Sequence, residues 1–311
     1  MRPMLVAALA ATTLLITGAC GGNDEATEPS GSTPSSAGAA AYPVTVGALT
    51  LEKKPEKIVS LSATGTEMLF AIGAGEQVTA VDDQSTYPTD APRTNLSGLK
   101  PNAEAIAAKD PDLVVLSNDI DKIVSQLDKL KIPVFLVAAA TDLGGTYQEI
   151  GDLGTLTGHR TEAEAVNAKM KTDIDKIVKD VPARNKPLSY YYELDPTLYT
   201  VTSKTFVGSI FSLFGLANVA DAADPDGARG GYPQLSAEAL VKSDPDTIFL
   251  ADTKCCQQSV QTVSARKGWS TVAAVKTKQI YPLDDDIASR WGPRTVDLVR
   301  AVADAVAKVP S

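Results

Sequence analysis

The 311-residue sequence has a single histidine, His159, only three cysteines and no excess of basic residues: 29 Lys and Arg stand against 38 Asp and Glu, a net charge of −9. Zinc and manganese sites depend on imidazoles and carboxylates, so one histidine argues against a histidine-rich metal site. Nucleic-acid binding needs a basic face, which interleaved charges do not provide. No GxSxG motif, glycine-rich phosphate loop or nucleophile with an evident base is present. The sequence therefore predicts a protein that is not an enzyme and has no cofactor.

The N-terminus carries an apolar stretch with the features of a targeting signal. Arg2 precedes an apolar run over residues 5 to 17, too short to cross a bilayer, and small residues lead to Cys20. This pattern resembles a bacterial lipoprotein signal in which Cys20 is lipidated, although Thr17 stands where leucine is usual. An ordinary cleaved secretion signal is the alternative. We expect residues 1–20 to be the signal and an extracytoplasmic protein held at the cell membrane only by the lipid anchor.

The segment after Cys20 predicts a spacer. Residues 21–43 are mostly Gly, Ser, Ala, Thr and Pro without an apolar period. Such a composition cannot bury a core and is typical of a flexible tether. The globular part of the chain is therefore expected to begin near residue 44.

From residue 44 onwards, short apolar runs alternate with helical periods. The runs are rich in Val, Ile and Leu and lack strict alternation, which indicates buried strands of a parallel-type sheet. The predicted strands are residues 57–61, Val78–Val81, residues 112–116, residues 133–137 and Thr247–Leu250. Strands separated by helices are typical of the α/β class.

One sequence unit occurs twice. Residues 103–116, AEAIAAKDPDLVVL, and residues 237–250, AEALVKSDPDTIFL, are identical at seven of fourteen positions with a constant offset of 134. Each copy predicts a helix capped by the preceding residue, Asn102 or Ser236, which breaks at Asp-Pro-Asp and leads into a strand. We expect two similar α/β lobes, residues 44–160 and residues 183–311.

A long helix is predicted between the two copies, over residues 161–182. Thr161 and Glu164 have the spacing of a capping box, and Pro182 ends the segment. One apolar stripe follows from the 4, 4, 3, 4 spacing of Val166, Met170, Ile174, Ile177 and Val181. A helix of this length spans about 30 Å, enough to join two lobes. The alternative is a helix packed within one lobe.

Four stretches together carry a family resemblance: residues 57–81, residues 86–115, residues 232–252 and residues 268–294. In order and spacing they resemble the extracytoplasmic substrate-binding proteins of ABC importers for vitamin B12, ferric siderophores and haem, most closely the vitamin B12-binding branch. The resemblance covers residues 44–307. It implies two α/β lobes joined by one long helix, with the ligand in the cleft between them.

The resemblance also implies a function. The protein would capture a metal chelate, a ferric siderophore or a cobalamin-type compound, as a monomer. It would deliver the chelate to an ABC permease and its ATPase. A sensor or adhesion lipoprotein of the same fold, binding haem or another small molecule, is the alternative. The resemblance further implies that Glu104 and Glu238, one in each repeat copy, dock onto the permease; their alternative role is to complement the helix dipole.

Ligand-binding residues are expected in loops at the carboxyl ends of the strands, as in open α/β sheets. This rule and the resemblance select Gln84, Tyr87, Ser117, Tyr199, Tyr232, Arg290 and Trp291. Aromatic rings with one arginine suit a large flat or anionic chelate. The tryptophans that the vitamin B12-binding branch places around the ligand are missing, however, and Gly98 or Leu99, and Ser117, stand near their positions. This departure leaves the ligand's identity open and favours a ferric siderophore or another chelate over a corrinoid. Glu67, the last residue of SATGTE (residues 62–67), is expected to be a capping-box residue with Thr64.

Cys255 and Cys256 are adjacent and follow the last predicted strand. Outside the cytoplasm thiols tend to oxidise, and with Cys20 lipidated these two would be the remaining candidates for a bridge. Consecutive Cα atoms are about 3.8 Å apart, below the usual disulfide range of about 4.4–6.8 Å. We expect a vicinal disulfide at the rim of the cleft. Two buried thiols acting as small apolar side chains are the alternative.

Overall fold

The computed structural model describes residues 41–310. The predicted signal, Cys20 and nearly all of the predicted tether lie outside these residues. The described part begins with an antiparallel hairpin of β1 (Val44–Val46) and β2 (Leu49–Leu51). Two separate four-stranded sheets follow, one in each lobe, so the two-lobed α/β fold predicted from the sequence is confirmed.

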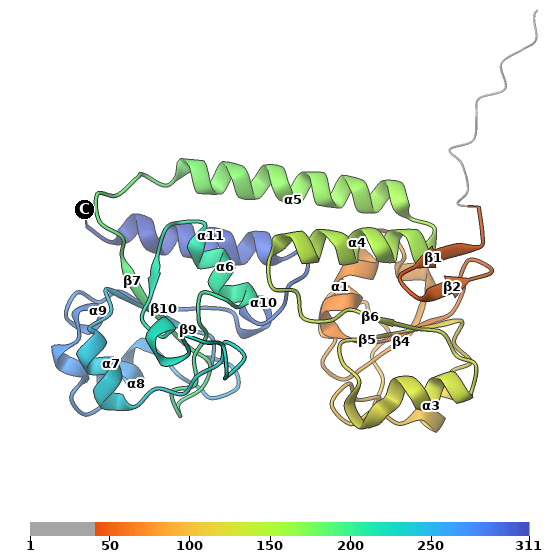
Figure 1. Cartoon of the computed structure of the whole chain (residues 1–311), viewed down its shortest axis with the longest axis horizontal. Helices are drawn as coiled ribbons and strands as arrows, with labels where there is room; N and C mark the ends of the chain where they lie inside the picture. Colours follow the sequence, from red (N-terminus) through yellow and green to blue (C-terminus); the bar gives the residue numbers. More distant parts are fainter. Residues whose placement is uncertain (1–40, 311) are drawn as a thin grey trace, which may run out of the picture. The chain divides into compact units, whose positions relative to one another are not determined.

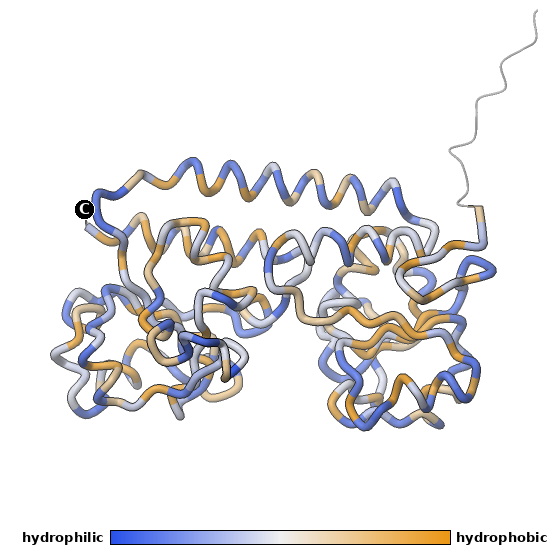
Figure 2. The backbone as a smooth tube through the Cα atoms, viewed as in Figure 1, coloured by the Kyte–Doolittle hydropathy of each residue, from blue (hydrophilic) through white to orange (hydrophobic). Residues whose placement is uncertain are grey.

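The N-terminal lobe contains a parallel sheet in the order β4-β3-β5-β6. Its strands are β3 (Ile58–Leu61), β4 (Val78–Val81), β5 (Leu113–Leu116) and β6 (Val134–Leu136). Its helices are α1 (Ala63–Ala71), α2 (Ala103–Ala107), α3 (Ile123–Lys129) and α4 (Leu143–Thr157), with 3₁₀ turns at Gly75–Gln77 and Ile120–Lys122. Figure 2 shows these strands as hydrophobic segments inside the lobe, in agreement with the complete burial of β3 and β5.

The C-terminal lobe contains a second parallel sheet, in the order β10-β9-β7-β8. Its strands are β7 (Ser189–Glu193), β8 (Ala217–Asn218), β9 (Thr247–Leu250) and β10 (Ile280–Pro282). Its helices are α6 (Phe206–Ser212), α7 (Ala237–Ser243), α8 (Val260–Ser264), α9 (Ala273–Lys276) and α10 (Asp285–Ala288), with 3₁₀ turns at Asp221–Ala223 and Trp269–Thr271. Strands β5 and β9 are the equivalent strands of the two repeat copies.

Helix α5 (Arg160–Asp180) runs across both lobes, with α4 and α11 (Thr295–Lys308) beside it (Figure 1). Its apolar stripe divides between the lobes. Met170 belongs to the core of the N-terminal lobe, whereas Ile174 and Ile177 belong to that of the C-terminal lobe. The predicted bridge between the lobes is therefore confirmed.

Two predicted capping boxes are wrong. Helix α5 begins at Arg160 with His159 as its N-cap, so Thr161 lies inside the helix and does not cap it. In α1 the N-cap is Ser62, whose hydroxyl accepts a hydrogen bond from the Gly65 amide at 3.0 Å. The predicted caps of the repeat are correct, because Asn102 and Ser236 accept from the amides of Ala105 and Ala239.

Candidate functional site

The candidate site is formed by loops at the carboxyl ends of parallel strands. In a parallel sheet these ends lie along one edge. In the N-terminal lobe, residues 82–88 follow β4 and Ser117 follows β5. In the C-terminal lobe, residues 194–199 follow β7, residues 219–236 follow β8, residues 251–258 follow β9 and residues 283–290 follow β10. Each lobe thus offers one loop-lined edge.

The two loop-lined edges contact each other through Arg290. Its Nη1 donates to Glu67 Oε1 at 2.8 Å, and its Nη2 donates to the carbonyl oxygen of Gln84 at 3.0 Å. Arg290 follows β10 in the C-terminal lobe, whereas Glu67 and Gln84 belong to the N-terminal lobe. These bonds join the segment after β10 in one lobe to α1 and to the loop after β4 in the other.

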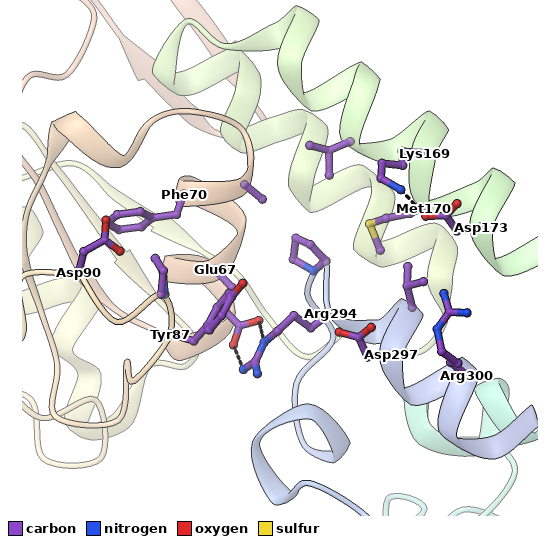
Figure 3. A pocket seen from close by; sticks show the side chains of 15 residues that line it. Glu67, Phe70, Tyr87, Asp90, Lys169, Met170, Asp173, Arg294, Asp297 and Arg300 are labelled. Carbon is purple, nitrogen blue, oxygen red and sulfur yellow. Dashed lines mark hydrogen bonds and ion pairs between the residues drawn. The ribbon is translucent and has the colours of Figure 1, made fainter. Parts of the chain in front are cut away.

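Arg294 adds a second contact with Glu67. Its Nε donates to Glu67 Oε2 at 2.9 Å, and its Nη2 donates to Oε1. Its guanidinium lies over the Tyr87 ring, 4.3 Å from the ring centroid (Figure 3). The Glu67 side chain is 1% exposed, and those of Arg290 and Arg294 are 10% and 19% exposed. Glu67, Arg290 and Arg294 thus form a buried cross-lobe cluster, and the expectation that Glu67 only caps α1 was wrong.

Three of the predicted ligand-binding residues are exposed tyrosines. Tyr87, Tyr199 and Tyr232 retain 46%, 43% and 48% of their accessible surface. Tyr199 forms a β-bridge with Gln234, so the segments that carry Tyr199 and Tyr232 run side by side. Because large aromatic side chains are usually buried, three exposed rings on the strand-end loops are available to an external partner.

The other predicted ligand-binding residues are placed differently. Gln84 is exposed and contacts Arg290 through its main chain, and Ser117 is half-buried beside Asn118. Trp291 is half-buried, packs against the cores of both lobes and donates from Nε1 to Glu149 Oε2 at 2.9 Å. Its ring therefore lies at the lobe junction rather than on the open surface of a loop. A role for these residues in ligand binding stays a prediction.

The cysteine loop, residues 251–258, is joined to the segment after β10. Cys255 and Cys256 form a disulfide in the structure, with Cα atoms 3.8 Å apart. Asp285 accepts hydrogen bonds from the amides of Thr253, Lys254 and Cys255 at 2.9, 2.8 and 3.0 Å. The redox state in the living cell stays a prediction; alkylation of the unreduced protein measures it, since two labels would mean two free thiols.

A scan against protein-family models matches residues 58–287 to the periplasmic binding protein family. The chain belongs to that family. A Bacillus subtilis protein, an uncharacterized ABC transporter substrate-binding lipoprotein named YvrC, is 30% identical over 280 residues, covering 85% of this chain and 86% of its own. A cobalamin-binding protein of Halobacterium salinarum is 31% identical and covers 83% of this chain and 71% of its own.

A solved structure gives the same fold. A possible iron-binding periplasmic solute-binding protein of Staphylococcus epidermidis superposes with a TM-score of 0.72 at 26% identity, covering 82% of this chain and 100% of its own. Its name and those of the relatives fit the family that the sequence resembles. The resemblance to substrate-binding proteins is therefore confirmed.

This periplasmic binding protein also contains a cavity of about 660 Å³ between α1, α5 and α11 (Figure 3). Phe70 and Met170 contribute apolar surface, and Tyr87 is the one predicted ligand-binding residue among its lining residues. The charged groups largely pair with each other, Glu67 with Arg294 and Lys169 with Asp173 at 2.6 Å. The size is typical of small-molecule sites, and the walls carry four carboxyl groups against three basic side chains, because Asp90, Asp297 and Arg300 line the cavity as well.

Among the described residues, no three His, Cys, Asp or Glu side chains are grouped so that they could hold a metal ion. In the same part of the chain, no helix combines the length and apolar character needed to cross a membrane.

A buried carboxyl pair lies where strand β7 ends and the cysteine loop begins. Glu193, at the end of β7, pairs with Arg266 through both carboxylate oxygens, at 2.6 Å each. Asp252, two residues after β9, is completely buried, and neither of its carboxyl oxygens has a hydrogen-bond donor within residues 41–310. Two carboxylates have no hydrogen between them, so Asp252 can bond to Glu193 only when it is protonated. Burial, followed by the charge of Glu193, raises the pKa of Asp252 from 3.8 to about 7.

This pair predicts a specific pH dependence. Between 3.8, the ordinary value, and about 7, the folded state binds a proton on Asp252 that the unfolded state lacks. The free energy of unfolding should therefore rise as the pH falls through this range. Asp252→Asn should flatten the dependence, measured as the difference between the two proteins in urea unfolding at about pH 8 and about pH 5. Equal pH dependence in both proteins would show that Asp252 titrates normally.

Proposed function

We propose that the chain is the substrate-binding lipoprotein of an ABC importer and captures a metal chelate between its two lobes. The observation that carries this proposal is the meeting of two loop-lined sheet edges across Glu67 and Arg290, in a chain of the periplasmic binding protein family. Exposed Tyr87, Tyr199 and Tyr232 on these loops would supply aromatic contacts to a large flat ligand. With Cys20 lipidated, a monomer anchored outside the cytoplasm would present the chelate to the permease and its ATPase.

The charges at the two edges favour an uncharged, cobalamin-type chelate over a polyanionic one. The Arg290 guanidinium is already bound by Glu67, Asp286 and the carbonyl of Gln84. Outside the buried positions, the strand-end loops carry more carboxyl groups than cations: Asp83 after β4 and residues 284–286 after β10, against Lys254 and Arg290. A ferric tricatecholate would meet net negative charge there, which opposes its binding. The cobalamin-binding relative from Halobacterium salinarum supports the same choice.

Calorimetric titration of the protein with cyanocobalamin, haemin, a ferric hydroxamate and a ferric tricatecholate tests this proposal. We expect saturable one-to-one binding of cyanocobalamin, with a dissociation constant of about 1 μM or lower, and no binding of the tricatecholate. Preference for the tricatecholate would overturn the charge argument and leave the importer function standing. Absence of binding to all four, with folded protein, would count against the metal-chelate proposal.

A further inference from the structure

Ionic contacts connect the N-terminal lobe to the cysteine loop of the other lobe. They begin at Glu67, which accepts from Arg290 Nη1 at 2.8 Å. Arg290 Nη2 donates to Asp286 Oδ1 at 3.1 Å, and Asp286 Oδ2 accepts from Lys254 Nζ at 2.9 Å. Lys254 is the residue directly before Cys255. Three ion pairs thus join a helix of one lobe to the disulfide of the other.

The acidic segment, residues 284–286, also holds the main chain of the cysteine loop. Asp285 accepts from three successive loop amides, and Asp284 Oδ1 pairs with Lys254 Nζ at 2.8 Å. Asp286, in the same short segment, is the partner of Arg290. A change at Arg290 therefore acts on the segment that positions the loop. Within this series of ion pairs, the Glu67 end is buried, whereas the side chains of Lys254 and Asp286 are 52% and 36% exposed.

We propose that Arg290 is a positioning residue that couples the cysteine loop to the N-terminal lobe, so that ligand affinity and the order of this loop change together. The inference rests on the proposed function only in its affinity part, because the loop is then one rim of the ligand cleft. Hydrogen-bond networks with two discrete arrangements are the physical carriers of such coupling. The earlier expectation gave Arg290 a direct ligand contact; here it acts through Glu67 and Asp286.

The test variant changes Glu67, which is the end of this series of ion pairs that lies in the N-terminal lobe. Glu67→Gln should speed amide hydrogen exchange of Lys254 and Cys255 by about three- to tenfold in the ligand-free protein, and weaken cyanocobalamin binding by a similar factor. Asp128→Asn is the matched control, since Asp128 is an exposed carboxylate on α3 of the same lobe. It should leave both quantities unchanged.

The outcomes separate the coupling from the proposed function. Weaker cyanocobalamin binding with unchanged loop exchange would overturn the coupling and keep the function. Faster loop exchange in a protein that binds none of the chelates would keep the coupling and remove the function. Unchanged loop exchange without binding would remove both.

A second variant guards against misfolding of Glu67→Gln. Lys254→Met replaces an exposed side chain at the other end of the chain and keeps its apolar stem. Because ion pairs at this exposure contribute little, the expected change in affinity and loop exchange is smaller, about twofold to threefold. In the double variant with Glu67→Gln, the two effects should be less than additive. Full additivity would mean that the two ends act independently and would contradict the proposal.

Discussion

Glu67→Ala should lower the free energy of unfolding by about 3–5 kcal/mol, the usual effect of removing one partner from a buried ion pair. The Glu67 side chain is 1% exposed and receives hydrogen bonds from both Arg290 and Arg294. Without it, two guanidiniums that are 10% and 19% exposed would face each other with no carboxylate between them. The loss should therefore exceed that of a single exposed pair, which contributes about 0–1 kcal/mol.

Urea unfolding followed by circular dichroism measures this loss. Asp128→Ala serves as the control, because this exposed carboxylate on α3 should change stability by less than about 0.5 kcal/mol. A loss below about 1 kcal/mol for Glu67→Ala would mean that the cross-lobe cluster does not hold the lobes together in solution. It would also weaken the coupling proposed for Arg290.

The double variant Glu104→Ala/Glu238→Ala should abolish uptake of the chelate by cells while its affinity for the isolated protein stays unchanged. Both glutamates are exposed in the first turn of equivalent helices, α2 and α7, one in each lobe. Two exposed carboxylates on equivalent elements can fix the register of a two-sided partner such as a permease. Within residues 41–310, neither glutamate side chain makes a hydrogen bond or ion pair with Glu67, Arg290 or Arg294 of the cross-lobe cluster.

Uptake of labelled cyanocobalamin in cells, together with calorimetry on the purified variant, separates docking from binding. The control variant Glu76→Ala/Asp304→Ala removes two other exposed acidic groups, one from the N-terminal lobe and one from α11. It should transport normally. Normal uptake by the Glu104→Ala/Glu238→Ala variant would refute docking through these residues and leave them as ordinary first-turn acids that complement the helix dipole.

Local signals predicted much of the fold. The five predicted strands all exist, with bounds close to those expected. Short apolar runs rich in β-branched residues are typical of buried strands, so the sequence pattern alone locates them. The repeat predicted two equivalent helix–strand units, α2 with β5 and α7 with β9. Strand β7 was missed: its sequence SYYYE contains three tyrosines and a glutamate, and burial of those rings depends on α6 and Trp269.

The interior of the site was less predictable. Glu67 and Arg290 are 223 residues apart, and no local spacing reveals such a pair. One sequence signal was available: Glu67 precedes Met68 and Leu69 in an apolar helix. A carboxylate buried in such a helix needs an oppositely charged partner. Trp291 was expected on the cleft surface, but its burial depends on packing against both cores, which strand-end position alone does not disclose.

The central claim is that one ligand is held between the strand-end loops of both lobes. Amide hydrogen exchange with and without saturating cyanocobalamin tests it most directly. We predict slower exchange in residues 82–88 of the N-terminal lobe and in residues 195–199 and 229–232 of the C-terminal lobe, all in the same complex. Protection in a single lobe, or only around the cavity between α1, α5 and α11, would contradict the claim.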